Sequence, residues 1–341
     1  MQPAQGEGPP QRIVKKRNGK TGSGNGGRTL FDLGVPAGRE IPKPQVIAAD
    51  EKWRLGRELA RRGILLGTSA FTASGWEGTF YPTGMKAAEY LRHYATRFPT
   101  VEVDSTFYGT PPEARVRNWY EKTPADFVFA AKVPQVITHD KVLVDCDAEF
   151  REFVNTMELL EEKLGPLLLQ FGYFPPRVFK SAKEFLARLA PFLKKLPHFQ
   201  STGAEPHRFV VEIRNKTWLD ERFLDMLREN RVALALIDQS WMPRPWEMEK
   251  PLELLTTDFA YVRWLGDRKG IEEVTTNWDK TVVDRRPDLL HWVEMFREFV
   301  RRDLKVYAYA NNHYAGNGPG TVKLFWELFA GETGKGQDPH P

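Results

Sequence analysis

Residues 209–238 read FVVEIRNKTWLDERFLDMLRENRVALALID. Two short runs rich in Val, Leu and Ile, residues 209–214 and 232–238, flank a segment at residues 221–230 whose apolar side chains recur at helical spacing. Both runs are apolar along most of their length, which is typical of parallel strands that are covered on both faces. The stretch therefore predicts a strand–helix–strand unit with a right-handed crossover.

The same alternation continues through most of the chain. Strands are predicted at residues 64–71, 101–108, 127–133, 167–173, 209–214, 232–238, 260–265 and 306–311. Helices are predicted at residues 86–98, 113–122, 147–163, 181–196, 221–230, 288–302 and 321–329, with no long helix in residues 238–259. This order predicts the α/β class and a single (β/α)₈ barrel of the TIM type. A doubly wound open sheet is the alternative, but the turn at residues 67–71 lacks the G-x-G-x-x-G pattern.

The composition is that of a globular protein, with 41% hydrophobic and 28% charged residues among 341. Residues 1–28 hold six Lys or Arg, one Glu and few large apolar side chains, so we predict a disordered basic tail. That tail carries a formal charge of +5, which leaves −1 for the rest of a chain whose total is +4. We predict a linker and an N-terminal helix in residues 29–62, the barrel domain in residues 63–332, and a second disordered tail in residues 333–341.

Several classes of protein are excluded by the sequence. Cys146 is the single cysteine, so the chain can form neither an intramolecular disulfide nor a multi-cysteine zinc site. No apolar run approaches the roughly 18 residues of a membrane span, and the N-terminus lacks the apolar segment of a secretory signal. We therefore expect a cytoplasmic protein with no membrane partner.

Polar side chains end almost every predicted strand. In a TIM barrel the carboxyl ends of the strands meet at one mouth, where catalytic residues lie. The first four strands end near Ser69, Asp104, Lys132 and Gln170, and the last four near Glu212, Arg214, Asp238, Arg263, Tyr309, Asn311 and Asn312. Glu212 and Arg214 are two residues apart, so they point to one face of their strand. The mouth is thus predicted to gather three cations and three acids.

The leading hypothesis is an enzyme that acts on an anionic or sugar-phosphate-like small molecule by lyase, isomerase or hydrolase chemistry. Lys and Arg side chains suit a phosphate or carboxylate group, and Glu212 is predicted to be the general base or acid, oriented by Arg214. The predicted catalytic residues are Glu212, Arg214, Lys132 and Asp104. The predicted substrate-binding residues are Ser69, Trp76, Tyr108, His139, Gln170, Asp238, Arg263, Asn311 and Asn312.

Other functions stay open. The basic tail and aromatic residues after the strands, such as Trp76 and Trp241, would also suit a nucleic-acid enzyme or binder, because bases stack on aromatic rings. A barrel that binds a metabolite without turnover is a third alternative. No cofactor is predicted. A divalent metal held by His139, His313, Glu212 and Asp104 is a lesser alternative, since no HxH or HExxH spacing supports it.

Seven segments stand at the strand ends: Gly67-Thr68-Ser69 with Trp76 and Phe80-Tyr81-Pro82, Asp104-Ser105-Thr106-Phe107-Tyr108, Lys132-Val133-Pro134 with Ile137-Thr138-His139, Leu168-Leu169-Gln170-Phe171, Glu212-Ile213-Arg214, Tyr261-Val262-Arg263 and Asn311-Asn312. Together they resemble motifs of the YecE-like proteins, a domain-of-unknown-function family with a TIM-barrel fold. The resemblance spans about residues 67–332 and implies the barrel but no reaction. Asp104 replaces the family's usual Asn, and Leu265 takes the place of a frequent His.

Overall fold

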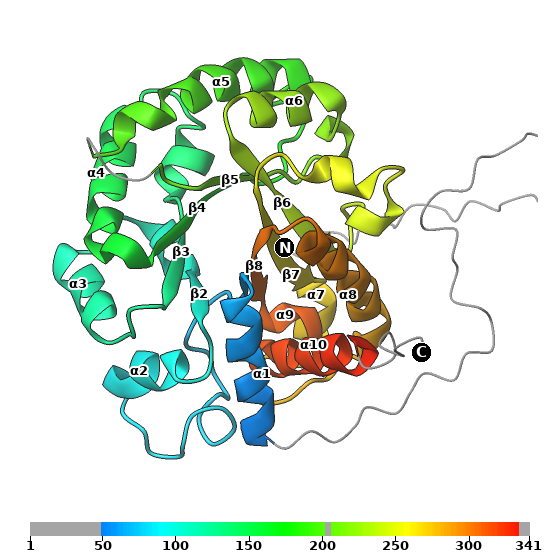
Figure 1. Cartoon of the computed structure of the whole chain (residues 1–341). Helices are drawn as coiled ribbons and strands as arrows, with labels where there is room; N and C mark the ends of the chain where they lie inside the picture. Colours follow the sequence, from blue (N-terminus) through cyan, green and yellow to red (C-terminus); the bar gives the residue numbers. More distant parts are fainter. Residues whose placement is uncertain (1–48, 202–205, 334–341) are drawn as a thin grey trace, which may run out of the picture. The chain divides into compact units, whose positions relative to one another are not determined.

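The structure, a computed structural model, describes residues 49–201 and 206–333. Eight parallel strands form a nearly closed barrel, and helices lie on its outside (Figure 1). The strands are β1 (Ile64–Thr68), β2 (Thr100–Val103), β3 (Val128–Lys132), β4 (Leu164–Gln170), β5 (Phe209–Glu212), β6 (Val232–Gln239), β7 (Phe259–Gly266) and β8 (Lys305–Ala310). Each overlaps one predicted strand, so the predicted (β/α)₈ barrel is confirmed.

Helices lie on the outer face of the strands and, where two short ones follow β7 and β8, at the carboxyl ends of the strands. They are α1 (Ala49–Arg61), α2 (Tyr90–Ala95), α3 (Glu113–Glu121), α4 (Asp147–Met157), α5 (Ala182–Lys195), α6 (Glu221–Glu229), α7 (Arg268–Val274), α8 (Arg286–Arg301), α9 (Asn312–Ala315) and α10 (Gly318–Thr333). The long connection after β6 contains two short 3-10 turns, η7 (Pro245–Glu247) and η8 (Pro251–Leu254), where no long helix was expected. The sequence therefore predicted the long helices and left out the short α7 and α9.

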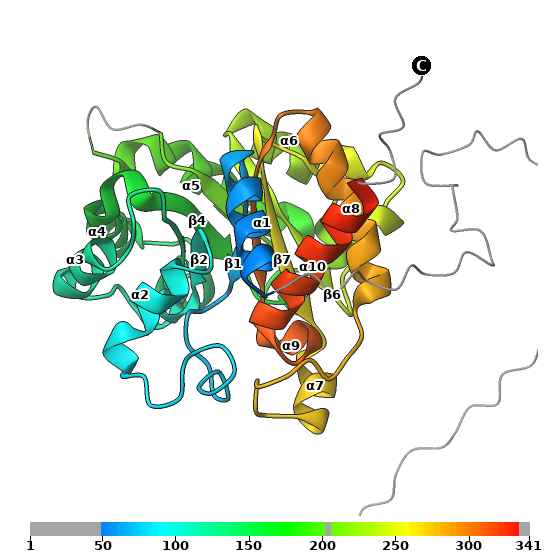
Figure 2. The ribbon, with the colours of Figure 1, turned by 60° about the horizontal axis from the view of Figure 1, so that its bottom comes forward.

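The two short helices follow β7 and β8 directly and depend on side-chain caps. Asp267 accepts a hydrogen bond from the Gly270 N–H at 3.2 Å, and Asn311 accepts one from the His313 N–H at 3.0 Å. Such caps satisfy backbone donors that a helix of one or two turns leaves without partners. In Figure 2, α7 and α9 lie beside the loop that follows β1, at the carboxyl ends of the strands.

The extra N-terminal helix, predicted at residues 50–62, is α1. Its Trp53 packs edge-on against Phe98 and Trp326, with ring centroids 5.3 and 5.7 Å apart. A Cβ on Gly56 would overlap the Trp326 ring, so glycine lets α1 lie close to α10. Helix α1 thus covers β1 between the end of α2 and α10 (Figure 1).

The barrel has one seam without a backbone ladder. Hydrogen-bonded strand pairs run in the order β1-β8-β7-β6-β5-β4-β3-β2, and none joins β1 to β2 within the described residues. The Tyr94 hydroxyl fills this gap: it accepts from the Thr68 N–H at 2.9 Å and donates to the Thr100 carbonyl at 3.2 Å. Gly67 makes the approach possible, because a Cβ there would overlap the Thr100 carbonyl oxygen.

Alternate residues of each strand face two different cores. Val210 and Tyr261 belong to a small cluster inside the barrel, whereas Val211 and Val262 belong to the large cluster between the strands and the helices. Since side chains alternate along a strand, residues two positions further on, such as Glu212, also face the interior. The strands are apolar on both faces along most of their length, but at their carboxyl ends a few polar side chains point into the barrel.

The predictions for the tails and linker fall on residues 1–48 and 334–341, outside the described residues. Thr333 is the last residue of α10. Among residues 49–201 and 206–333, no helix is both long enough and apolar enough to cross a membrane.

Candidate functional site

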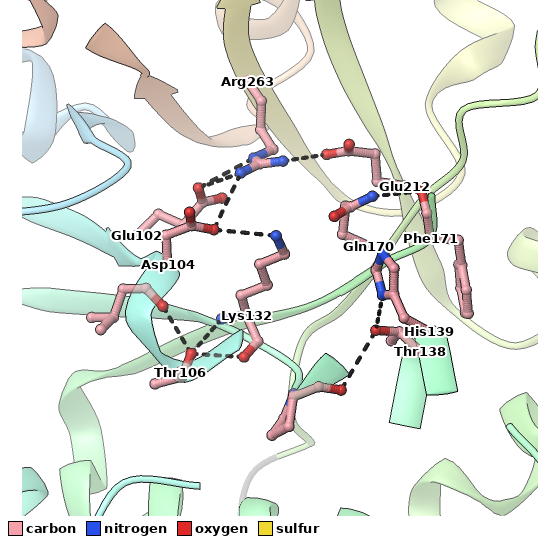
Figure 3. Close-up of polar contacts among 12 residues, drawn as sticks. Glu102, Asp104, Thr106, Lys132, Thr138, His139, Gln170, Phe171, Glu212 and Arg263 are labelled. Carbon is pink, nitrogen blue, oxygen red and sulfur yellow. Dashed lines mark hydrogen bonds and ion pairs between the residues drawn. The ribbon is translucent and has the colours of Figure 1, made fainter. Parts of the chain in front are cut away.

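Four interior-facing residues form a buried charged layer near the carboxyl ends of the strands. They come from β2, β3, β5 and β7: Glu102, Lys132, Glu212 and Arg263. Val101 and Val103 lie in the outer core, so the residue between them must face the interior. Figure 3 shows Arg263 between the two glutamates, with Asp104 and Lys132 beside it. Isolated charges would be costly at this depth, so their pairing decides whether the layer is stable.

Arg263 uses every nitrogen of its guanidinium group. Nη1 donates to Glu212 Oε2 at 2.6 Å, while Nε and Nη2 donate to Glu102 Oε1 at 3.2 and 2.8 Å. Tyr261 donates its hydroxyl to the other Glu102 oxygen at 2.6 Å. Both glutamates are fully buried, and burial raises the pKa of Tyr261 well above its ordinary value. Arg263 was predicted to bind substrate, but its guanidinium nitrogens are all bonded to Glu102 and Glu212, so it holds these two side chains in place.

Glu212 is held by a second arginine. Arg214 Nε donates to Glu212 Oε1 at 2.5 Å, and its Nη1 donates to the Gln239 side chain. Burial raises the pKa of Glu212, but Arg214 and Arg263 outweigh burial and lower it to about 2. A carboxylate with this pKa and no exposed surface is a poor proton carrier near neutral pH. The structure therefore places Glu212 as a positioning residue and does not favour the predicted role of general base.

Lys132 differs from Arg263 because the N–H donors of its amine are not taken up by hydrogen bonds to other described side chains. Its Nζ lies 3.3 Å from Asp104 Oδ1 and 3.9 Å from the centre of the Phe107 ring, and it makes no hydrogen bond within the described residues. Thr106 fixes the backbone beneath it: its hydroxyl donates to the Lys132 carbonyl at 2.7 Å and accepts from the Lys132 N–H at 3.1 Å. Burial lowers the pKa of Lys132, although Asp104 works in the opposite direction.

Three more predicted residues border this pair. His139 stacks edge-on against Phe107 at 5.0 Å, and its Nδ1 lies 2.8 Å from the Thr138 hydroxyl. Burial and then Lys132 lower the pKa of His139, so its ring is neutral near pH 7. Gln170 donates to the Phe171 carbonyl at 2.5 Å (Figure 3). Ser69 continues the interior alternation of β1, and its buried Oγ has no hydrogen-bond partner among the described residues.

Asp238, predicted at the mouth, lies outside the barrel. In β6, Ile237 faces the interior cluster and Leu236 the outer one, so Asp238 faces the helices. Its Oδ2 accepts from Trp292 Nε1 at 3.1 Å and from the Tyr314 hydroxyl at 2.7 Å. Its Oδ1 accepts from Arg244 Nε at 3.1 Å. Asp238 therefore ties β6 to α8 and α9 instead of facing a substrate.

Asp238→Asn is expected to destabilise the protein by about 1–3 kcal/mol, because an amide cannot accept all three buried hydrogen bonds. Urea unfolding followed by tryptophan fluorescence measures the change. Asp225→Asn is the matched control: Asp225 pairs with Arg228 at the surface, so its loss should cost less than about 1 kcal/mol. Unchanged stability of Asp238→Asn would contradict a structural role for this carboxylate.

Four other predicted residues do not join the charged layer. Trp76 is buried, and its Nε1 donates to Asn312 Oδ1 at 3.3 Å. Asn312 also accepts from the Gly318 N–H at 2.8 Å, so it braces the start of α10. Asn311 caps α9. Tyr108 is 78% exposed at the rim.

The proposed metal ligands are not gathered. Within residues 49–201 and 206–333, no three His, Cys, Asp or Glu side chains lie close enough together to hold a metal ion. His313 Nε2 lies 3.0 Å from Glu272 Oε1, and the His313 ring packs against Trp278. His139 packs against Phe107 instead.

The sequence analysis missed three members of the network: Glu102, Tyr261 and Gln239. A signal for Glu102 was present, because it is a single acid between two valines in an apolar strand and lies two residues from Asp104. Tyr261 stands in the same relation to Arg263. Gln239 lies one residue beyond the predicted end of its strand, where β6 shifts register against β7.

Comparison with known proteins agrees with this barrel. The sequence model of a family described as "Protein of unknown function DUF72" matches residues 65–341. The UPF0759 protein YunF of Bacillus subtilis is 26% identical over 275 residues, which are 75% of this chain and 92% of YunF. The UPF0759 protein YecE of Escherichia coli is 36% identical over 100 residues, which are 29% of this chain and 37% of YecE.

Solved structures give the same result. A DUF72 family protein from Thermotoga maritima has a TM-score of 0.58 at 25% identity, over 80% of this chain and 99% of that one. A DUF72 family protein from Enterococcus faecalis has a TM-score of 0.57 at 21% identity, over 78% of this chain and 95% of that one. These matches confirm the resemblance drawn from the strand-end motifs, and the chain belongs to the DUF72 family of proteins of unknown function.

Proposed function

We propose that this protein is an enzyme in which Lys132 and Asp104 transfer protons on a small polar molecule at the carboxyl-terminal mouth of the barrel. The observation that carries the proposal is the Lys132 amine, largely buried yet without a hydrogen bond within the described residues. Asp104 is the nearest charged partner of this amine, so its N–H donors are available to a ligand at the mouth. Lysine with a lowered pKa can exchange a proton near neutral pH.

The charge balance of the layer supports a polar substrate over a strongly anionic one. Three acids, Glu102, Asp104 and Glu212, match three cations, Lys132, Arg214 and Arg263. Both arginines are already paired with glutamates, so they supply orientation and little free positive charge. The expected anionic or sugar-phosphate-like substrate would therefore owe its binding mainly to Lys132 and to backbone or hydroxyl donors such as Ser69.

Exposed aromatic side chains at the rim support a ligand that contains a ring. Tyr108, Tyr173 and Trp241 are 78%, 64% and 50% exposed and follow β2, β4 and β6. Exposed rings offer flat apolar surfaces on which sugar rings or nucleobases stack. A sugar or nucleoside is thus the substrate class that best combines a polar mouth with an aromatic rim.

Lys132→Met is expected to lower turnover by about 100-fold or more, which is the usual contribution of a general acid or base. The full-length protein would be screened with sugars, sugar phosphates, keto acids and nucleosides, by thermal shift and then by mass spectrometry of the products. Lys305→Met is the matched control, because burial also lowers the pKa of Lys305 but this residue starts β8 at the opposite end of the barrel. Equal turnover in wild type and Lys132→Met would contradict the proposal.

A further inference from the structure

Two buried lysines in the described part of the chain are bonded in opposite ways. Lys163 Nζ donates to the Tyr120 carbonyl, the Thr123 carbonyl and the Thr123 hydroxyl at 2.6, 2.7 and 3.4 Å. It thereby uses all three of its protons, as a buried ammonium group must. Lys132 has one ion-pair partner and an aromatic ring. The Lys132 nitrogen can therefore lose a proton and present its lone pair to a ligand without breaking a set of hydrogen bonds, which Lys163 cannot do.

Charged groups surround the Lys132 amine. Asp104 Oδ1 is buried and lies 3.3 Å from Nζ, and it receives no hydrogen bond from the described residues. Arg263, held by the two buried glutamates, places a fixed positive charge on the same side (Figure 3). Burial is the largest influence and lowers the pKa of Lys132; Arg263 lowers it further, whereas Asp104, Glu212 and Glu102 raise it. A desolvated lysine beside another cation is a nucleophile near neutral pH.

We infer that Lys132 forms a covalent imine with an aldehyde or ketone group of the substrate. The inference rests on the proposed function, since it names the substrate class of the same mouth. It differs from that proposal in one respect: the amine attacks carbon, whereas proton transfer alone forms no bond between enzyme and substrate.

The step balances without an oxidant, a reductant or a metal ion. The Nζ lone pair attacks the carbonyl carbon, and the C–N bond forms while the carbonyl oxygen becomes a hydroxyl group. Both protons of the neutral amine leave with that oxygen as water. Asp104 Oδ1, 3.3 Å from Nζ, is placed to carry a proton from nitrogen to oxygen. The neutral imine then takes up one proton from solvent at its nitrogen, and the resulting iminium ion draws electrons from the neighbouring carbon, which eases the breaking of a C–H or C–C bond there.

The layer beneath Lys132 explains how the amine is held for this step. Thr106 binds both the N–H and the carbonyl of Lys132, and the Phe107 ring lies along its side chain. The nearby Arg263 cannot turn toward the substrate because its three nitrogens are bonded to Glu102 and Glu212. A positioned amine suits imine formation, because the attacking nitrogen must approach the carbonyl carbon in a defined geometry.

Imine formation is tested by reductive trapping. Full-length protein is incubated with glycolaldehyde, dihydroxyacetone or pyruvate and then with sodium borohydride, followed by intact-mass measurement and peptide mapping. We expect one adduct, with the mass of the probe less one oxygen atom, on Lys132. Labelling of Lys132 should be faster than that of exposed lysines, since a lowered pKa gives more neutral amine at a given pH. Lys132→Arg should abolish the adduct, and Lys305→Arg should keep it.

The outcomes separate this inference from the proposed function. No adduct with any probe, or an equal adduct in Lys132→Arg, overturns imine formation. If Lys132→Met still loses turnover of a substrate that forms no adduct, the proton-transfer function stands without the imine. If Lys132→Met keeps full turnover, both fall together.

Discussion

Arg263→Met is expected to lower the free energy of unfolding by about 3–5 kcal/mol, the usual cost of removing one partner from a buried ion pair. The substitution leaves Glu102 without its bidentate partner and removes one of two cations from Glu212, and both carboxylates are fully buried. Chemical denaturation by urea, followed by tryptophan fluorescence and circular dichroism, measures the loss.

The matched control is Arg301→Met, which changes the net charge by the same amount. Arg301 pairs with Glu298 at the surface of α8 and has a side chain that is 65% exposed, so its loss should cost less than about 1 kcal/mol. If Arg263→Met is no less stable than this control, the layer is not a paired buried network. Should Arg263→Met fail to fold, Arg263→Met with Glu102→Gln should restore soluble protein, because it removes one orphaned charge.

The pH dependence gives an independent readout of the same layer. The pKa of Glu212 is lowered from 4.5 to about 2, so its pairing stabilises the wild type fully above about pH 4.5. That stability is lost as pH falls from about 4.5 toward 2, since the unfolded chain takes up the proton first. In Arg263→Met, protonation relieves an unfavourable buried charge. The stability gap between the two proteins should therefore narrow as pH falls below 5.

Gly67→Ala is expected to cost about 3 kcal/mol or more, at the upper end of overpacking effects. A Cβ at this position would overlap the Thr100 carbonyl oxygen and lie 3.1 Å from the Tyr94 hydroxyl, so it would push β1 away from β2. The barrel has no backbone ladder at this seam within the described residues, so separating β1 from β2 would break the Tyr94 bridge that joins them. Thermal and urea unfolding of the full-length variant measure the cost.

Gly331→Ala in α10 is the control, because a Cβ there meets nothing within 4 Å and alanine favours helix. It should leave stability unchanged or raise it by up to about 1 kcal/mol. Tyr94→Phe tests the same seam without adding atoms. It leaves the Thr68 N–H and the Thr100 carbonyl without their bridge, which should cost about 1–3 kcal/mol. A stable Gly67→Ala would show that the seam can open without penalty.

Strand and helix order could be predicted from local patterns. Residues 209–214 and 232–238 are apolar on both faces, a pattern that is typical of parallel strands covered by helices. The strand-end motifs also pointed to Lys132, Glu212, Arg214 and Arg263, which do converge. The short helices α7 and α9 could not be predicted, since one or two turns carry too little periodicity and depend on a single cap.

The roles of these residues required the tertiary structure. In a strand that is apolar on both faces, the sequence does not tell which alternate side chains face the axis, and closure of the barrel decides it. Closure turns Asp238 toward Trp292 and Tyr314 and brings the overlooked Glu102 to Arg263. The linear alternation of β and α segments thus determined the barrel and the end at which polar residues gather. The tertiary structure decided which charged side chains pair across strands that are far apart in the sequence. The same pairing leaves the Lys132 amine available to a ligand.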